Sequence, residues 1–162
     1  MNSTNALAGQ SHRLLQLGVA LLLFSSFEGF AIAYLAVPRL GLAAHTLSAL
    51  QGILILALGL LWPRLHLSEN GSRLAFWLLI YSAVAILVAY VLAAAWGAGN
   101  STMPLAAGVA QGSTSQEMAI KIVAYSSAPT GILALTIILW GLRLRSSAQA
   151  NGDQAESRGG PA

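Results

Sequence analysis

Four side chains that can move protons or hold a polar group lie close together near the start of this chain: Glu28, Arg39, His45 and Gln51. Only 8% of the residues are charged, so an acid, a guanidinium and an imidazole within one short stretch need a reason. An acid and an imidazole can give and take protons during a single reaction. We therefore expect Glu28, His45 and Arg39 to be catalytic.

The surroundings of Glu28 strengthen this expectation. Glu28 lies in a long apolar stretch, 14–37, and a carboxylate at the centre of a bilayer costs about 2.5–3.5 kcal/mol even on the lenient insertion scale. A sequence keeps such a residue for function or for an ion pair, here with Arg39 or Lys121. His45 has a similar alternative, because an imidazole near a helix start can bond to a neighbouring carbonyl group.

The composition predicts an integral membrane protein. The 162 residues are 56% hydrophobic and their mean hydropathy is +0.70, whereas a soluble domain carries about 25% charged residues. A membrane-spanning helix needs roughly 20 largely apolar residues. Four stretches qualify, at about 14–37, 42–62, 74–96 and 117–142. The fold class expected is therefore all-α, a four-transmembrane-helix bundle over 14–144, with disordered tails at 1–13 and 145–162.

The basic residues predict how the bundle is oriented. If the spans alternate, Arg13, Arg64, Arg73, Arg143, Arg145 and Arg158 fall on one side, against Arg39 and Lys121 on the other. The positive-inside rule then places both termini in the cytoplasm and the protein in the cytoplasmic, or inner, membrane. Because these residues stand singly at span ends, we expect no nucleic-acid partner. A cleaved signal peptide ending near Ala33 is the alternative for the first span, but that span is long and contains Glu28.

The third and fourth predicted helices contribute candidates for binding a substrate. Tyr90 and Tyr125 can form the walls of a pocket, and Gln51 and Lys121 can contact a ligand. Lys121 can also pair with Glu117, four residues earlier on the same helix. The segment 97–116 between these helices is long and contains no Lys or Arg. Connections of this length are often lids or binding loops.

No metal or cofactor motif is present in the sequence. Cysteine is absent, and we find no phosphate-binding loop, dinucleotide fingerprint or metal-spacing motif. We therefore expect no metal and no cofactor. The alternative is a metal or haem bound through His45 with Glu28, since imidazole and carboxylate are competent ligands.

Several longer segments resemble a known family. PRLGLAAH (38–45), QGILILALGLLWPRL (51–65), AAAWGAGNSTMPLAAG (93–108) and LWGLRL (139–144) are similar, in this order, to the hydroxylaminobenzene mutases of nitroarene-degrading bacteria. The resemblance covers roughly 13–144. It implies an isomerase that converts hydroxylaminobenzene to 2-aminophenol by moving the hydroxyl group from nitrogen to the ortho carbon. It supplies no catalytic residues, so the roles expected of Glu28, His45 and Arg39 follow from their own side-chain chemistry.

The implied reaction suits these residues. The N–O bond breaks more easily when its oxygen is protonated, and the arylnitrenium-like cation that results is stabilised by aromatic faces. Glu28 or His45 would protonate the oxygen and the other would remove the ortho proton, in a dry pocket under 97–116. The small aromatic hydroxylamine would enter from the membrane lipid, and no organic cofactor is needed because the reaction is redox neutral.

Two other functions fit the same pattern. Small multidrug exporters are also four-helix proteins with a Glu in the first span, and they would show proton-coupled efflux without product formation. A non-catalytic membrane subunit would show neither activity. In every case four short helices make a thin bundle, so we expect a homo-oligomer.

Overall fold

In the part that the structure describes, the chain folds into four long helices, and the longest connection between them, 97–113, joins the third to the fourth. The computed structural model describes the backbone of residues 3–158 and the side chains of residues 7–142. In order, the elements are α1 (Ser3–Ala31), the short 3-10 helix η1 (Ile32–Tyr34), α2 (Pro38–Leu61), η2 (Trp62–Arg64), α3 (Glu69–Trp96), α4 (Pro104–Ala107) and α5 (Thr114–Arg158). Four of these helices, α1, α2, α3 and α5, are long and apolar enough to cross a membrane. This confirms the prediction of four long apolar helices that are able to span a membrane.

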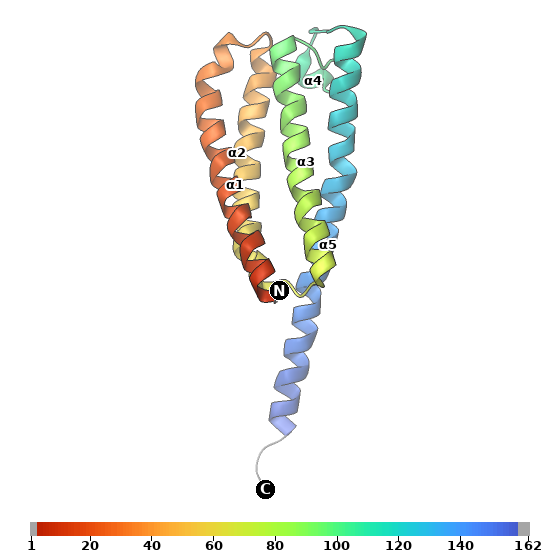
Figure 1. The fold of residues 1–162 in the computed structure, drawn as a ribbon. Helices are drawn as coiled ribbons and strands as arrows, with labels where there is room; N and C mark the ends of the chain where they lie inside the picture. The colour runs from red at the N-terminus through yellow and green to blue at the C-terminus, as the bar shows by residue number, and fades with distance from the viewer. Residues whose placement is uncertain (1–2, 159–162) are drawn as a thin grey trace.

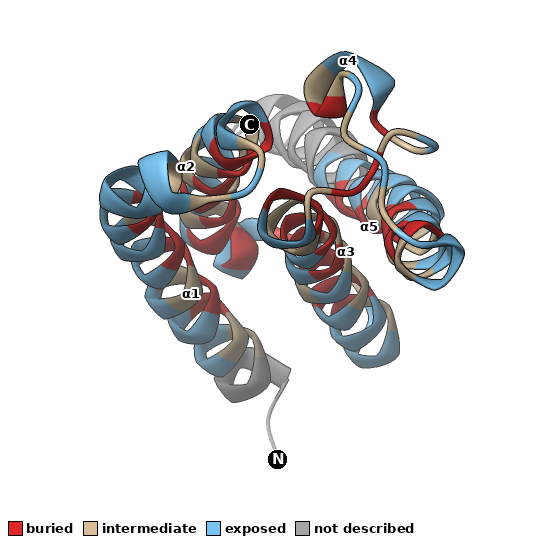
Figure 2. Ribbon diagram, turned by 90° about the horizontal axis from the view of Figure 1, so that it is seen from above, coloured by how far each residue is buried: buried red, intermediate tan, exposed pale blue. Residues whose placement is uncertain are grey.

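The four long helices form two antiparallel pairs. Helix α1 packs along α2, α3 packs along α5, and α2 joins the pairs through its contact with α3. Seen from above, α1 and α5 lie at opposite sides, with α2 and α3 between them (Figure 2). The start of α1 and the end of α5 lie toward the same end of the bundle, and α4 caps the other end (Figure 1). The two pairs therefore meet mainly through α2 and α3.

Local residue chemistry explains where the helices begin and end. Pro38 is the first residue of α2, where its missing N–H costs nothing. The Ser68 hydroxyl accepts a hydrogen bond from the Gly71 N–H and so caps the start of α3. Gly97 ends α3 with a φ of 65°, a left-handed conformation that glycine adopts readily. The chain then enters the connection 97–113.

The tail predictions were wrong for most of their length. Helix α1 already begins at Ser3 and α5 continues to Arg158, so residues 3–13 and 145–158 are helical instead of irregular. Both segments extend a long helix, and extension needs no new nucleation step. Residues 1–2 and 159–162 of the predicted tails lie outside the described residues.

Small residues allow α1 and α2 to approach closely. A Cβ atom added to Gly18 would lie 2.9 Å from the carbonyl oxygen of Gly52, and one added to Gly52 would lie 3.0 Å from that of Gly18. Ser48, Gly52 and Gly59 lie along this interface on one face of α2: Ser48 is fully buried, and a Cβ on Gly59 would lie 3.2 Å from the Leu14 Cβ. We call this α1–α2 interface the seam.

We predict that Gly52→Val destabilises the protein by about 1–3 kcal/mol, because the added methyl groups force the seam apart. Thermal or denaturant unfolding in detergent measures the change. The control is Gly9→Val on α1, where a Cβ would meet nothing within 4 Å. Equal unfolding midpoints for the two variants would contradict the close-packing argument.

Candidate functional site

A cavity of about 470 Å³ lies between α2, α3 and α5, under the connection that joins α3 to α5. Its volume falls within the range of small-molecule sites, roughly 300–1,000 Å³. Each of these four parts of the chain contributes side chains. The residues that line it are Leu47, Gln51, Ser82, Ile86, Tyr90, Thr102, Met103, Ala124, Tyr125, Ser127 and Ala128. Three predicted binding residues, Gln51, Tyr90 and Tyr125, thus come together in one place.

Two of these residues carry a buried oxygen without a partner. Among the described residues, neither Oε1 of Gln51 nor Oγ1 of Thr102 makes a hydrogen bond. An unsatisfied buried polar group costs about 1–3 kcal/mol, so two of them beside one cavity suggest a ligand that completes their bonding. Both groups are uncharged, so a neutral polar molecule suits them better than an ion.

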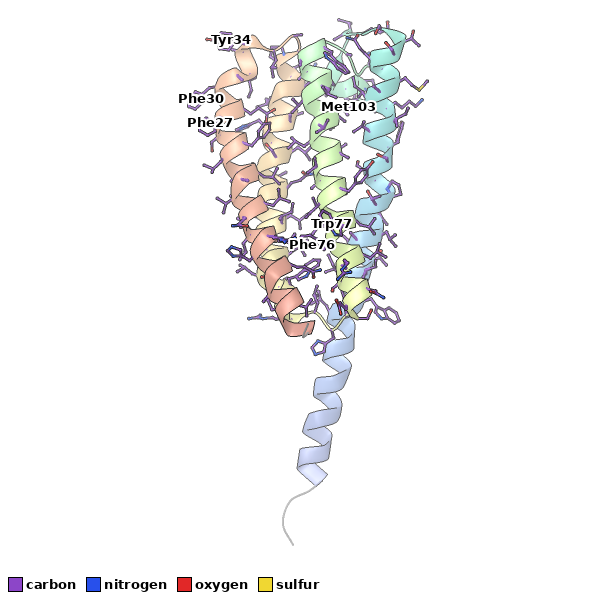
Figure 3. All side chains as sticks on the ribbon, viewed as in Figure 1. Phe27, Phe30, Tyr34, Phe76, Trp77 and Met103 are labelled. Carbon is purple, nitrogen blue, oxygen red and sulfur yellow. The ribbon has the colours of Figure 1, made fainter. Side chains whose placement is uncertain are left out.

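The roof of the cavity comes from the connection 97–113. The backbone N–H groups of Thr102 and Met103 both donate to the Gly99 carbonyl, at 3.1 and 2.7 Å. Gly99 has a φ of 107°, which other residues rarely adopt. Met103, labelled in Figure 3, is buried and belongs to the apolar cluster that contains Ala93 of α3 and Ala124 of α5. The prediction that this segment covers a pocket is therefore confirmed for Thr102 and Met103.

Glu28 and His45 lie together in the seam. The His45 Nδ1 is 2.8 Å from the Ser25 carbonyl oxygen and 3.1 Å from the Ser25 hydroxyl. Ser48 donates to the Glu28 carboxylate at 3.5 Å, and its hydroxyl is also 2.9 Å from the His45 carbonyl oxygen. Glu28 is only 8% exposed. We call Ser25, Glu28, His45 and Ser48 the seam cluster.

The seam cluster fixes which nitrogen of His45 carries a proton. A carbonyl oxygen only accepts hydrogen bonds, so the Nδ1 that lies 2.8 Å from the Ser25 carbonyl must be the N–H donor. In the neutral ring Nε2 is then the free nitrogen, with its lone pair available. This nitrogen can act as a base or bind a metal, since metal-binding histidines commonly hold their other N–H against a carbonyl group.

The structure corrects the prediction of a single chamber. Neither Glu28 nor His45 is among the residues that line the cavity with Gln51, Tyr90 and Tyr125. The helical repeat is the reason: His45 and Ser48 face α1, whereas Leu47 and Gln51, four residues apart, face the cavity. The acid and the imidazole lie in the α1–α2 seam, whereas Gln51, Tyr90 and Tyr125 line the cavity on the side toward α3 and α5.

Arg39 and Lys121 do not line the cavity either. The exposed Arg39 guanidinium donates to the Leu105 carbonyl of α4 at 3.0 Å, so it ties the start of α2 to the connection above the cavity. The Lys121 ammonium lies over the ring of Tyr125, 5.9 Å from its centre. The predicted pair of Glu117 with Lys121 is wrong, because in the described part of the chain the one ion pair is Arg73–Glu69. The Glu117 carboxylate is instead bonded to Gly99, Ser101 and Gly112.

Comparisons with known proteins identify the family. The sequence profile of the styrene oxide isomerase family matches residues 10–143. The chain belongs to the styrene oxide isomerase family. Two of its relatives are hydroxylaminobenzene mutases of Ectopseudomonas oleovorans. HabB is 41% identical over 82% of this chain and 81% of its own length, and HabA is 34% identical over 77% and 93%. No solved structure matches the chain.

Membership of the styrene oxide isomerase family confirms the resemblance and decides the class of protein. The chain is an enzyme, an isomerase, and it is similar to mutases that are named for hydroxylaminobenzene. This sets aside both the exporter and the non-catalytic subunit. The four apolar helices fit an isomerase that works in contact with the membrane.

Sequence reasoning missed some residues of this isomerase's cavity and roof. Thr102, Met103 and Ser127 line the cavity, and Glu117 holds the roof. Ser127 could have been found, since it lies two residues before Pro129, which removes a backbone N–H from the interior of the helix. Thr102 and Met103 carried no signal beyond their place in a long connection.

Proposed function

We propose that this isomerase converts hydroxylaminobenzene to 2-aminophenol in the cavity between α2, α3 and α5. The observation that carries the proposal is the combination of two tyrosines, Tyr90 and Tyr125, with the unpartnered oxygens of Gln51 and Thr102 around one small cavity. Hydroxylaminobenzene matches this lining, because its aryl ring is apolar and carries a single polar substituent. The relatives named hydroxylaminobenzene mutase support this choice of substrate.

In this proposal each group has a defined task. The ring of the substrate lies against Tyr90 and Tyr125, whose faces stabilise the cation that forms when the N–O bond breaks. The N–H and O–H of the hydroxylamine donate to Gln51 Oε1 and Thr102 Oγ1, which orients the N–O bond. The roof keeps bulk water away, so that oxygen is delivered to the ortho carbon and not elsewhere on the ring.

Proton transfer remains assigned to Glu28 and His45 in this proposal. One of them protonates the departing oxygen, and the other removes the ortho proton that restores the aromatic ring. Since the pair does not line the cavity of its own chain, we propose that a second copy brings its seam cluster to the cavity. This gives the expected homo-oligomer a functional reason. Phe27 and Phe30 of α1 and Tyr34 of η1 project away from the bundle (Figure 3) and are 73%, 82% and 90% exposed, which offers an apolar face for that copy.

A metal or haem, the alternative to cofactor-free catalysis, would bind through His45. The free Nε2 of this residue fits a group with one protein ligand, such as haem, whereas no cluster of three metal-binding side chains occurs among the described residues. A bound metal or haem would act as the Lewis acid on the hydroxylamine oxygen. Metal analysis and the visible spectrum of purified protein, with His45→Ala as the control, separate this alternative from cofactor-free acid–base catalysis.

The proposal is tested by giving detergent-purified protein hydroxylaminobenzene without oxygen and separating the products by chromatography. We expect 2-aminophenol as the main product, at a rate proportional to enzyme. Formation of 4-aminophenol, as from water attack on a free cation, or of no product above the enzyme-free rate, would refute it.

Styrene oxide is the second candidate substrate, because the family profile carries its name. The two reactions share a step. The N–O bond of hydroxylaminobenzene or the C–O bond of styrene oxide next to the ring breaks, and the resulting cation rearranges without a change of oxidation state. The same preparation assayed with styrene oxide distinguishes them. A kcat/KM for styrene oxide above that for hydroxylaminobenzene would reverse the order of the two substrates.

We expect each of two variants, Gln51→Leu and Thr102→Val, to lower the activity of the enzyme without lowering its stability. Each removes an unpartnered oxygen, so the unfolding temperature should stay the same or rise. Each also leaves an N–H or O–H of the substrate without its acceptor, so kcat/KM for hydroxylaminobenzene should fall roughly 5–100-fold for an unsatisfied group that costs about 1–3 kcal/mol. Thr136→Val is the matched control, since this hydroxyl is exposed and bonds within its own helix to Ile132. A lower unfolding temperature in both cavity variants would mean that these oxygens have partners.

The location proposed for the enzyme is the inner membrane, crossed four times, with both termini in the cytoplasm. The uneven distribution of Arg and Lys supports this orientation. Fusing a reporter that is active only in the cytoplasm to residue 162 tests it, and an inactive fusion would reverse the topology.

A further inference from the structure

A buried carboxylate stands at the start of α5 without any cationic partner in the described part of the chain. Glu117 is 9% exposed. Its Oε1 accepts from the backbone N–H groups of Gly99 at 2.7 Å and Gly112 at 3.1 Å. Its Oε2 accepts from the Ser101 N–H at 3.1 Å and from the Ser101 hydroxyl at 2.6 Å. Four donors thus converge on one side chain, and three of them belong to the backbone.

These bonds join both ends of the connection 97–113. Gly99 and Ser101 lie near its start, and Gly112 lies near its end, just before α5 begins. Thr102 and Met103, which line the cavity, follow Ser101 directly. The Gly99 carbonyl accepts from both of their N–H groups, so the residue that Glu117 holds also fixes the two roof residues. Glu117 itself does not line the cavity.

We infer that Glu117 is a positioning residue of the isomerase, which holds Thr102 and Met103 over the substrate through Gly99 and Ser101. The inference rests on the proposed function. Only a carboxylate meets the demand of the site, because both of its oxygens accept hydrogen bonds. A glutamine would turn its NH₂ group toward N–H donors on one side, and two of the four bonds would be lost. An aspartate keeps both acceptors on a shorter side chain.

The position of the roof can be measured without any substrate. The chain has no cysteine, and Met103 is only 8% exposed, so Met103→Cys provides a single buried thiol. We expect a water-soluble maleimide to label this thiol at least tenfold faster in the Glu117→Gln background than with Glu117 in place. The control is Glu69→Gln, at the start of α3, whose carboxylate is exposed and pairs with Arg73. Equal labelling rates in all three backgrounds would overturn the inference.

Kinetics then test whether the roof acts on the substrate. With Met103 intact, Glu117→Gln should raise the KM for hydroxylaminobenzene at least tenfold and change kcat less than threefold, and Glu117→Asp should recover part of the loss. A fall in kcat at unchanged KM would overturn the positioning role. If the wild-type enzyme does not turn over hydroxylaminobenzene, the proposed function fails, and the labelling rates alone decide whether Glu117 holds the roof.

Discussion

Glu28→Gln and His45→Ala are each expected to lower kcat/KM for hydroxylaminobenzene by about 10²–10⁴-fold, the usual contribution of a positioned acid or base. Glutamine keeps the shape of Glu28 and its bond to Ser48 but cannot donate an acidic proton. Alanine removes the free Nε2 of His45. The measurement is the initial rate of 2-aminophenol formation, with circular dichroism to show that the helices persist.

The chain offers matched controls for both changes. His66 lies in the connection before α3, and Glu69 is the first residue of α3. Both side chains are exposed. His66→Ala and Glu69→Gln should therefore leave the rate within twofold of wild type. If the seam variants also stay within threefold while Gln51→Leu is impaired, the cavity residues perform the chemistry without Glu28 and His45.

The helices could be predicted because apolar length is a direct consequence of bilayer thickness. A run of about 20 apolar residues has few other uses, and the four runs became α1, α2, α3 and α5. The seam could also be predicted from the sequence, since the spacing of Ser48, Gly52 and Gly59 alone places them on one face of the helix. These features depend only on residues that are near one another in sequence.

The arrangement of the site depends on contacts between distant residues, which spacing does not report. Helical periodicity separates His45 from Gln51, but it does not say that α1 covers the first and that α3 and α5 surround the second. Glu117 shows the same limit. From sequence its nearest opposite charge is Lys121, four residues away, whereas the fold offers it the N–H groups of Gly99, Ser101 and Gly112. Several backbone donors satisfy a carboxylate better than one exposed ammonium.

The separation of the seam cluster from the cavity leads to the second large prediction, that inactive copies complement each other. One copy carries Glu28→Gln and the other carries Gln51→Leu with Tyr90→Ala, and two different affinity tags isolate the mixed oligomer. If the enzyme is a dimer in which the seam cluster of one copy serves the cavity of the other, one of the two sites of the mixed dimer is intact. Such a dimer should recover about half of the wild-type activity, because the two copies share the interface symmetrically.

The reciprocal mixture provides the control. Here all three changes lie on one copy and its partner is wild type, so the dimer contains the same substitutions in the same number. With sites shared between copies, both sites are now damaged and the mixture should be nearly inactive. With sites built within one copy, the results reverse: the reciprocal mixture keeps half the activity and the complementing mixture has none. The ratio of the two rates thus decides whether catalysis occurs between subunits, since total charge, composition and helix packing are the same in both mixtures.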